Sequence, residues 1–274
     1  MIELPEARTL ARQLRKEILG KEIVDVGGNF TDHKFTFYYG NPVEYASLLV
    51  GKKVTEIRDR NYYVEIIMED CALVFRDGAN LRFYDNREDF KEKSKLCIVF
   101  KDGSFLNVTT SMYSAIAVFK IKEGYDNPYY QMELERIGAM DQEFTFDYFC
   151  SLIDDKTEKL SAKAFLATEQ RILGIGNGVV QDILFSAALH PKRKMNTLTE
   201  LELKDLYEAT KMVLQCMIEK GGRDTEKDLY GQAGGYSTIL SNKTYKKGCP
   251  KCHGEIKKEQ FLGGSIYYCP TCQK

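Results

Sequence analysis

Four cysteines near the end of the chain have the spacing of a metal site. They occur as Cys249-x2-Cys252 and, after sixteen residues, Cys269-x2-Cys272. Each pair places two thiolates on one side of a tight turn, and two such turns complete a tetrahedral cage for Zn2+. Four sulfur ligands leave no open coordination position, so we expect a structural zinc ribbon in which His253 is not a ligand. A disulfide pairing is the weaker alternative, because the chain has no signal-peptide pattern.

The amino terminus is a second candidate for chemistry. The chain opens MIELPEARTL, which places Glu3 beside the terminal amino group and before a helix expected from about Pro5 to Leu19. An α-amino group titrates near neutral pH, so part of it is an unprotonated nucleophile, and a nearby carboxylate can transfer protons. The structural alternative is that Glu3 only interacts with the positive end of the helix.

A third candidate is the stretch KAFLATEQRILGIGNGVVQDILFSAALHPKRK. We expect one amphipathic helix from about Ser161 to Leu173 and a second that begins at Asn177 and ends before His190. Asn177 is placed to cap the second helix, and Gly178 leaves its first turn sterically open. The exposed N–H groups and positive dipole of such a start bind phosphate. A plain helical hairpin is the alternative interpretation.

Two kinds of sequence pattern must position these candidates. Up to about residue 130, short segments rich in Val, Ile, Phe and Tyr alternate with Gly, Asn and Asp, which is typical of an antiparallel β-sandwich or barrel. Residues 143–235 change to helical spacing, including a helix that Thr199 and Glu202 begin as a capping box and Gly221-Gly222 ends. The sequence therefore predicts an α+β fold with four parts: a β-sandwich with an opening helix (1–130), a linker (131–142), a helical domain (143–240) and a zinc ribbon (241–274).

Composition limits the classes of protein. At 274 residues with 43% hydrophobic and 29% charged residues, the chain is expected to form globular domains with a sizeable core. No long apolar run predicts a membrane span, so no membrane partner is expected. The net charge of −1 is uninformative, but residues 241–274 carry seven Lys against two Glu, which suits phosphate binding or simply solubility. Four other cysteines are expected as buried thiols: Cys71, Cys97, Cys150 and Cys216.

One further loop has two interpretations. The glycine-rich stretch RDTEKDLYGQAGGYSTILSN connects the last expected helix to the ribbon. Its Tyr230 and Tyr236 could line a mobile lid, or the stretch could be an ordered surface loop.

Three motifs together resemble the formamidopyrimidine-DNA glycosylase and endonuclease VIII family. They are ELPEAR at the start, AFLATEQRILGIGNGVVQDILFSAALHP as a helix-two-turn-helix, and YYCPTCQ at the end. Their order and spacing match the family over essentially the whole chain, and Arg8 is closer to the endonuclease VIII branch. The resemblance implies base-excision repair of DNA, in which a damaged base is flipped out of the stack and an N-terminal amine attacks the sugar C1′, followed by strand cleavage as an abasic-site lyase.

The resemblance also assigns roles to residues. It implies that Glu3 handles protons and that the nucleophile is the amine of Ile2, or of Met1 if Met1 is retained. The expected partner is double-stranded DNA, damaged or containing abasic sites, bound by a monomer in the cytoplasm at the nucleoid. Six residues are expected to bind DNA: Asn177, Gly178, Lys163, Arg60, Lys257 and Lys258.

The chain departs from the family pattern at three positions. The family has proline after the initiator methionine, whereas this chain has Ile2, a bulky residue that disfavours removal of Met1. A phosphate-contacting lysine of the family falls at Asn61, and a ribbon arginine falls at Gly264. Loss of two cationic contacts should weaken DNA binding unless other basic residues compensate, for which Arg58, Arg60, Lys257 and Lys258 are the candidates.

Two functions from different classes remain. The first is a DNA glycosylase and abasic-site lyase with an altered nucleophile, which Glu3 favours. The second is a catalytically silent relative that binds lesions or DNA structure, which Ile2, Asn61 and Gly264 favour. RNA binding is a more distant third, with no motif to support it.

Overall fold

The computed structural model describes residues 1–28, 34–86 and 94–274. Its contacts divide the chain into two compact units. Unit 1 comprises Met1–Leu134 and Glu226–Gly234, and unit 2 comprises Glu135–Thr225 and Gly235–Lys274. The short return of the chain to unit 1 was not expected, because the sequence assigned these residues to the helical region.

Unit 1 is built on a seven-stranded sheet with the order β1-β6-β7-β5-β4-β3, and β2 pairs with β7 off this path. The expected α+β fold with an N-terminal β-sandwich is confirmed. The helices are α1 (Leu4–Ile18), α2 (Tyr45–Leu49) and α3 (Pro128–Glu135), with a 3-10 turn η1 (Pro42–Glu44). The strands are β1 (Ile23–Gly27), β2 (Thr36–Tyr39), β3 (Val54–Arg60), β4 (Tyr63–Met68), β5 (Cys71–Tyr84), β6 (Leu96–Phe100) and β7 (Phe105–Lys120).

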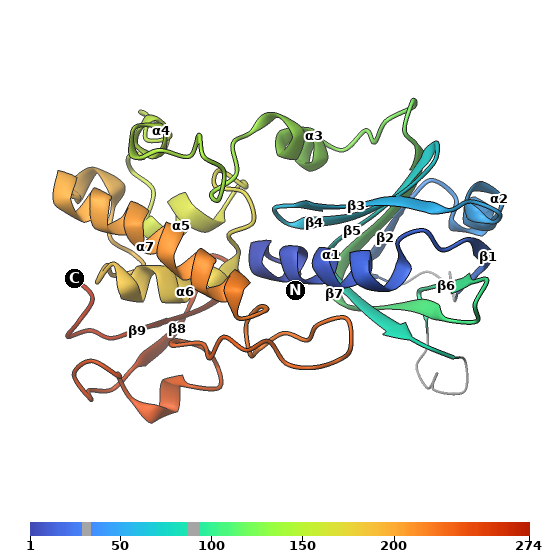
Figure 1. Ribbon diagram of the computed structural model, residues 1–274. Coiled ribbons are helices and arrows are strands. Elements are labelled where there is room, and N and C mark those ends of the chain that lie inside the picture. Colours follow the sequence, from blue (N-terminus) through green and yellow to red (C-terminus); the bar gives the residue numbers. More distant parts are fainter. Residues whose placement is uncertain (29–33, 87–93) are drawn as a thin grey trace. The chain divides into compact units, whose positions relative to one another are not determined.

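Helix α1 forms where the sequence predicted it and covers part of the sheet. Proline in its first turn suits a helix start, and its apolar side chains at Leu10, Leu14 and Ile18 recur every four residues along one buried face. That face packs on β3 and β4 (Figure 1). Burial of this stripe, more than helix propensity, fixes the amino-terminal end of the chain against the sheet.

Strands β5 and β7 differ from the prediction. Each is one long strand where the sequence predicted two, and β2 pairs with β7 in parallel although an antiparallel sheet was expected. The β5–β7 ladder continues across a register shift between Asp77 and Ala79. Gly78 allows this crossing, because a Cβ there would lie 1.8 Å from the carbonyl oxygen of Ser111. Asp77 and Met112 both have positive φ, at 56° and 62°.

Unit 2 contains four helices within the described residues and a two-stranded sheet. The helices are α4 (Phe146–Ser151), α5 (Ala162–Ala167), α6 (Asn177–Ser186) and α7 (Glu200–Glu219), with 3-10 turns η3 (Met195–Thr197) and η4 (Tyr245–Lys247). The strands are β8 (Lys257–Phe261) and β9 (Gly264–Tyr268). Helix α6 packs on both α5 and α7.

The helix ends of unit 2 agree with the sequence at α7 and disagree at α5. Thr199 and Glu202 form the expected capping box, and Gly221 and Gly222 follow α7 with positive φ. The helix expected from Ser161 to Leu173 ends at Ala167 instead, because Thr168 is extended and the next two residues have positive φ.

Two expectations about side chains and membranes have different outcomes. Among the residues described, no helix has the length and apolar character needed to cross a membrane.

Of the four cysteines outside the ribbon, Cys71 is buried, whereas Cys97, Cys150 and Cys216 are partly exposed. The expectation of four buried thiols was therefore wrong for three of them, since apolar neighbours in sequence do not fix which face of a strand or helix is covered.

Candidate functional site

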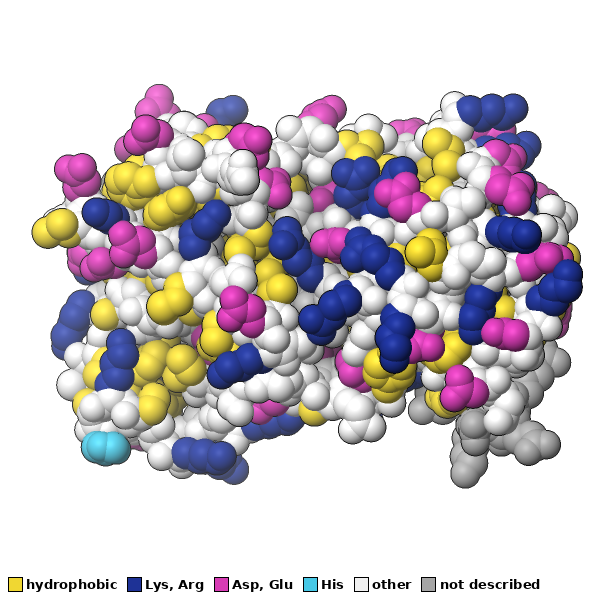
Figure 2. Space-filling model, viewed as in Figure 1, with side chains coloured by type: hydrophobic (Ala, Val, Ile, Leu, Met, Phe, Trp, Pro, Cys, Tyr) yellow, Lys and Arg dark blue, Asp and Glu magenta, His cyan; other side chains and the backbone are white. Residues whose placement is uncertain are grey.

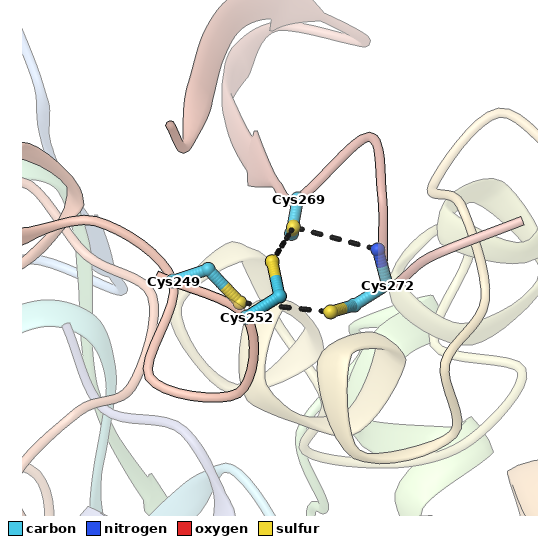
Figure 3. Close-up of side chains that lie close together, drawn as sticks. All are labelled: Cys249, Cys252, Cys269 and Cys272. Atoms are coloured by element: carbon cyan, nitrogen blue, oxygen red, sulfur yellow. Dashed lines mark hydrogen bonds between the residues drawn. The ribbon is translucent and has the colours of Figure 1, made fainter. Parts of the chain in front are cut away.

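The four ribbon cysteines converge on one point (Figure 3). Their sulfur atoms all lie within 4.8 Å of one another, with 3.7 Å between Cys249 and Cys272 and 3.5 Å between Cys252 and Cys269. Tetrahedral zinc with bonds of about 2.3 Å requires sulfur–sulfur distances of about 3.8 Å. The donor set and its spacing therefore fit one tetrahedral metal ion. His253 is exposed, as expected for a residue outside the site.

The ribbon is a hairpin that packs on α6. Strands β8 and β9 pair in antiparallel fashion, and Leu262 and Gly263 between them both have positive φ, the conformation of a tight hairpin turn. Behind the metal site, Cys249 and Cys269 pack with Phe185 of α6 in one buried cluster. A metal ion would therefore hold together the two ends of a segment that has only a small core of its own.

The start of α6 is joined to the ribbon by two amide side chains. Asn177 donates from Nδ2 to the carbonyl oxygen of Ser265 at 3.2 Å. Gln181 donates to the same oxygen at 3.0 Å, and its own Oε1 accepts from the Tyr267 N–H at 3.1 Å. Asn177 was expected to cap α6, but Gly176 is the N-cap and Asn177 is the first helical residue. The asparagine therefore positions β9 against the helix instead of closing the helix end.

Gly264 is matched to Asn177. A Cβ at position 264 would lie 3.0 Å from both Cγ and Oδ1 of Asn177. Gly264 is thus the residue that lets the Asn177 amide approach β9.

This close fit predicts that any side chain at position 264 lowers the stability of the folded protein. We expect Gly264→Ala to lower the free energy of unfolding by about 1 kcal/mol, because the Asn177 amide must give up its bond to Ser265 or the strand must shift. Gly27→Ala is the matched control, since a Cβ there meets nothing within 4 Å and its φ is not positive. Chemical denaturation of the two variants measures the difference, and equal stabilities would contradict this role of Gly264.

Asp182 anchors the segment that leads from unit 2's helices into the ribbon. Its carboxylate accepts from the N–H groups of Ile239 and Leu240, both at 2.8 Å, and the side chain is fully buried. Burial raises the pKa of Asp182 to about 6, although the two backbone N–H groups oppose that rise.

The raised pKa predicts a pH dependence of stability. Between about pH 4 and pH 6 the folded protein holds the Asp182 proton more tightly than the unfolded chain does, so stability falls as pH rises through this window. The expected loss is of the order of 3 kcal/mol. Thermal or urea unfolding across this range should show the slope in the native protein and its absence in Asp182→Asn. Identical slopes in the two proteins would contradict the raised pKa of Asp182. Because both proteins carry the same four ribbon cysteines, the metal site contributes equally to the two slopes.

The basic residues proposed from the sequence lie in different surroundings. Lys163 is only 3% exposed and donates to the carbonyl oxygen of Phe261 at 2.6 Å, and burial lowers its pKa. Its ammonium supports the end of β8 and does not face solvent. Lys257 and Lys258 are exposed on β8, where Lys257 pairs with Glu255 at 2.6 Å. Figure 2 shows one face on which basic and acidic side chains are interspersed.

The β3–β4 hairpin carries the other substituted position. Asn61 forms its turn with a φ of 25° and donates from Nδ2 to the Glu133 carboxylate of α3 at 2.7 Å. Arg60 lies 3.6 Å from the fully buried carboxylate of Glu65. Arg58 pairs with Glu56 at 2.6 Å. Of the basic residues proposed to compensate at this position, Arg58 and Arg60 therefore each already have an acidic neighbour in unit 1.

The amino terminus is held by two contacts. The N–H of Ile2 donates to the carbonyl oxygen of Asp77 at 2.7 Å, and the Ile2 side chain is 4% exposed. The amino group of Met1 forms an ion pair with the carboxylate of Glu226, while the Met1 side chain remains partly exposed. Glu3 is buried at the start of α1, in a capping box with Glu6. The helix-cap role of Glu3 that the sequence left open is thus present.

Glu226 belongs to the strap, which we define as residues 226–234. The strap lies along α1 (Figure 1, orange). Gln13 donates to Asp228 at 2.8 Å and accepts from the N–H of Leu229 at 3.0 Å, and Leu229 is buried in the core of unit 1. Tyr230 donates to Glu17 at 2.7 Å. Of the two interpretations of this loop, an ordered segment agrees with these contacts.

The contact between Glu226 and Met1 could not be predicted from the sequence, because it joins residues 225 positions apart. The only available signal was that Glu226 lies within the glycine-rich stretch for which the sequence left two interpretations open. Tyr236, expected to line a lid with Tyr230, is 6% exposed and belongs to unit 2. The burial of Tyr236 favours the ordered loop over the lid, which were the two interpretations left open from the sequence.

The order of these parts defines a class of protein: a β-sandwich unit with an opening helix, then a helical unit that ends in a cysteine ribbon. Comparison with known sequences identifies the class. Residues 1–109 match the formamidopyrimidine-DNA glycosylase N-terminal domain and residues 137–228 match the formamidopyrimidine-DNA glycosylase H2TH domain. The chain belongs to the formamidopyrimidine-DNA glycosylase family.

Individual relatives agree along the full length. The chain is 27% identical to the formamidopyrimidine-DNA glycosylase of Brevibacillus brevis over 281 residues, covering 100% of this chain and 99% of the relative. It is 28% identical to that of Bacillus cereus, with the same coverage. These relatives carry the formamidopyrimidine name and do not single out the endonuclease VIII branch suggested by Arg8.

Solved structures share the fold. The Lactococcus lactis Fpg in complex with DNA containing an abasic site superimposes with a TM-score of 0.83 at 23% identity, covering 99% of both chains. MutM (Fpg) from Thermus thermophilus gives a TM-score of 0.81 at 23% identity, covering 99% of this chain and 98% of the other. At this identity the similarity establishes only the fold of the chain. The function of the site depends on this chain's own residues.

Proposed function

We propose that the protein is a base-excision repair enzyme that binds damaged double-stranded DNA, flips the lesion, cleaves the N-glycosidic bond and nicks the strand as an abasic-site lyase. Membership of the family supports this function. The observation within this chain that carries it is the amino group of Met1, which is partly exposed and paired with the carboxylate of Glu226.

The proposed nucleophile is the amine of Met1. Ile2 is buried and its N–H donates to the Asp77 carbonyl oxygen, so the residue after the proposed nucleophile is held against β5. A retained methionine places the reactive nitrogen one residue before the position of the family's proline. The ion pair with Glu226 compensates for this displacement, because it holds the Met1 nitrogen in a fixed position.

The proposed reaction divides proton transfer between two carboxylates. Glu226 accepts a proton from the Met1 ammonium. At a lesion the free amine attacks C1′ as the N-glycosidic bond breaks, the base leaves with the bonding electrons and a proton, and opening of the sugar ring gives an imine. At an abasic aldehyde the oxygen leaves as water and an imine forms between nitrogen and C1′. Loss of a proton from C2′ then expels the 3′ phosphate, which breaks the strand. We assign the proton transfers at the sugar to Glu3, two residues after Met1 in the chain.

The remaining assignments concern binding. The metal is proposed to be Zn2+, held by Cys249, Cys252, Cys269 and Cys272, where it stabilises the ribbon and takes no part in the reaction. Lys257 and Lys258 are the proposed phosphate contacts on the ribbon, and the start of α6 at Asn177 and Gly178 is the proposed backbone contact. Lys163 supports this surface from within. The placement of the protein at the nucleoid, as a monomer, follows from the proposed substrate.

Borohydride trapping tests the proposal. Incubating the protein with a duplex that contains one abasic site, in the presence of borohydride, should reduce the imine and give a covalent protein–DNA species. Glu3→Gln should slow strand cleavage by about 10²- to 10⁴-fold, the range of general acid–base catalysis. Glu143→Gln, an exposed carboxylate in unit 2, is the control and should cleave at the native rate.

A silent DNA-binding relative is the second candidate. The observations that favour it are the amide of Asn61 where a lysine was expected, and the glycine at 264 filled by Asn177. The same experiment separates the two functions. Normal affinity for the abasic duplex with no trapped species would reject the enzyme and support the binding protein.

A further inference from the structure

A cavity of about 260 Å³ opens on unit 2 where the segment after α3, the end of α4 and the loop after α5 meet. None of the assignments above uses it. Its volume lies slightly below the range of about 300 to 1,000 Å³ that drug-sized ligands fill, so it suits a smaller molecule. The lining residues that the argument uses are Arg136, Tyr148, Leu152, Asp154, Glu169 and Arg171. We call it the arginine cavity.

Two guanidinium groups are held at the arginine cavity by backbone oxygens. The Arg171 side chain is only 12% exposed, and its Nη1 donates to the carbonyl oxygen of Phe165 at 3.1 Å. Its guanidinium also lies 5.6 Å from the centre of the Phe165 ring. Arg136 donates from Nη1 to the carbonyl oxygen of Gln170 at 2.9 Å. Because both groups are already oriented, an oxyanion can bind them with little further loss of side-chain entropy.

An exposed carboxylate already pairs with one of these groups. Arg171 donates from Nη2 to Oε2 of Glu169 at 2.9 Å, and Arg136 donates to the carbonyl oxygen of the same residue at 3.4 Å. The two arginines therefore flank one residue. The Glu169 side chain is 79% exposed, and an ion pair this exposed contributes little to stability. An external anion can thus replace the Glu169 carboxylate at small cost.

Further donors of the arginine cavity are unused. Within the described part of the chain, the printed contacts of Arg136 involve only Nη1, and the hydroxyl of Tyr148 has no hydrogen-bond partner. The second carboxylate of the lining, Asp154, accepts from two backbone N–H groups at 3.0 and 2.9 Å, which offset part of its charge. Arg136, Arg171 and Tyr148 therefore offer three donor groups to one space.

We propose that the arginine cavity binds the terminal phosphate of a phosphate monoester. Such a phosphate has three terminal oxygens, one for each of the three donor groups, whereas a carboxylate has two. Leu152 and the ring of Tyr148 supply an apolar wall for the group that carries the phosphate. The phosphate can belong to a free small molecule or to the end of a DNA strand, because the same donors serve both. The inference does not depend on the proposed lyase reaction, which borohydride trapping tests separately.

Calorimetric titration of the full-length protein with methyl phosphate tests the site. Arg136→Gln should weaken binding about 10- to 100-fold, the effect of losing a hydrogen bond from a charged group. Glu169→Gln should strengthen binding about 2- to 5-fold, because it removes the internal competitor. Lys204→Gln and Glu208→Gln, which change exposed residues of α7 outside the cavity, are the matched controls and should bind as the native protein does. Equal affinities of Arg136→Gln and Lys204→Gln, or no gain in Glu169→Gln, overturn the inference.

Chemical modification gives a measurement on the native protein that does not depend on the folding of a variant. Phenylglyoxal modifies exposed arginines, and methyl phosphate should protect Arg136 from it. Arg12, which is exposed on α1, should be modified equally with and without methyl phosphate. Equal modification of Arg136 under the two conditions overturns the inference.

Two duplexes identify the source of the phosphate. They have the same sequence, and only one carries phosphate at its 5′ ends. A preference for the phosphorylated duplex that Arg136→Gln abolishes assigns the arginine cavity to a DNA strand end. Equal affinity for the two duplexes, together with binding of methyl phosphate, assigns it to a free phosphate compound.

Discussion

Cys269→Ala should yield a protein without a metal ion and without measurable affinity for abasic DNA. Cys269 is fully buried and lies 3.5 Å from the sulfur of Cys252, so its removal deletes one of four ligands and opens the small core that surrounds the site. Structural zinc contributes apparent free energies of about 10 to 16 kcal/mol to the folding of isolated zinc-finger peptides. A loss of that size exceeds what the contacts of β8 and β9 can offset.

The matched control for this substitution is Cys216→Ala. Cys216 lies on α7, is partly exposed and is not part of the four-cysteine cluster, so its removal should leave metal content and DNA affinity unchanged. Metal analysis, limited proteolysis of the ribbon and a DNA-binding titration measure the three consequences. A Cys269→Ala protein that keeps one equivalent of metal, or that binds DNA normally without it, would contradict the structural role of the site.

Glu226→Gln should reduce the rate of covalent trapping on abasic DNA by about 10²- to 10⁴-fold, the contribution of a positioned proton acceptor. The substitution keeps the shape of the side chain but removes the charge that pairs with the Met1 amino group. Affinity for an unreactive tetrahydrofuran duplex should change little, because the strap retains its other contacts to α1. A rate equal to that of the native protein would remove Glu226 from the reaction.

Glu17→Gln separates chemistry from anchoring. Glu17 accepts a hydrogen bond from Tyr230 of the strap but does not contact the amino terminus, and that bond lowers its pKa. Loosening the strap at this point should leave the trapping rate within a few-fold of native. If Glu17→Gln and Glu226→Gln slow trapping equally, the strap acts only by its position and Glu226 is not the proton acceptor.

The features that the sequence predicted correctly are those with a local cause. The two Cys-x2-Cys pairs determine the metal site because each turn places its own two ligands. The capping box of Thr199 and Glu202 and the glycines after α7 likewise depend on neighbours three or fewer residues apart. The order of a β-sandwich unit and a helical unit follows from the change in hydrophobic period along the chain.

Features with a distant cause could not be predicted. Residues 75–80 include Asp, Gly and Asn, which are rare inside strands, but pairing with β7 makes them part of one continuous strand because Gly78 allows the two backbones to cross. Lys163 looks like a surface cation, yet the carbonyl oxygen of Phe261, almost a hundred residues away, binds its ammonium in the interior. The pairing of Glu226 with Met1 requires the complete fold of unit 1.

The position of Asn177 shows how a correct element can carry a wrong role. The helix begins where the sequence placed it, but the asparagine side chain binds Ser265 of β9 and Gly176 caps the helix. The reason is Gly264, whose missing side chain leaves room for the amide. Asn177 and Gly264 are far apart in the chain, yet the structure packs them directly against each other.

Peptide mapping of the borohydride-reduced complex tests the central claim most directly, because it identifies the nitrogen that attacks the sugar. After nuclease and protease digestion, the mass of the reduced sugar fragment should be found on the α-amino group of an amino-terminal peptide that still begins with Met1. Attachment to a lysine side chain, or to a peptide that begins with Ile2, would contradict the claim that a retained methionine held by Glu226 is the nucleophile.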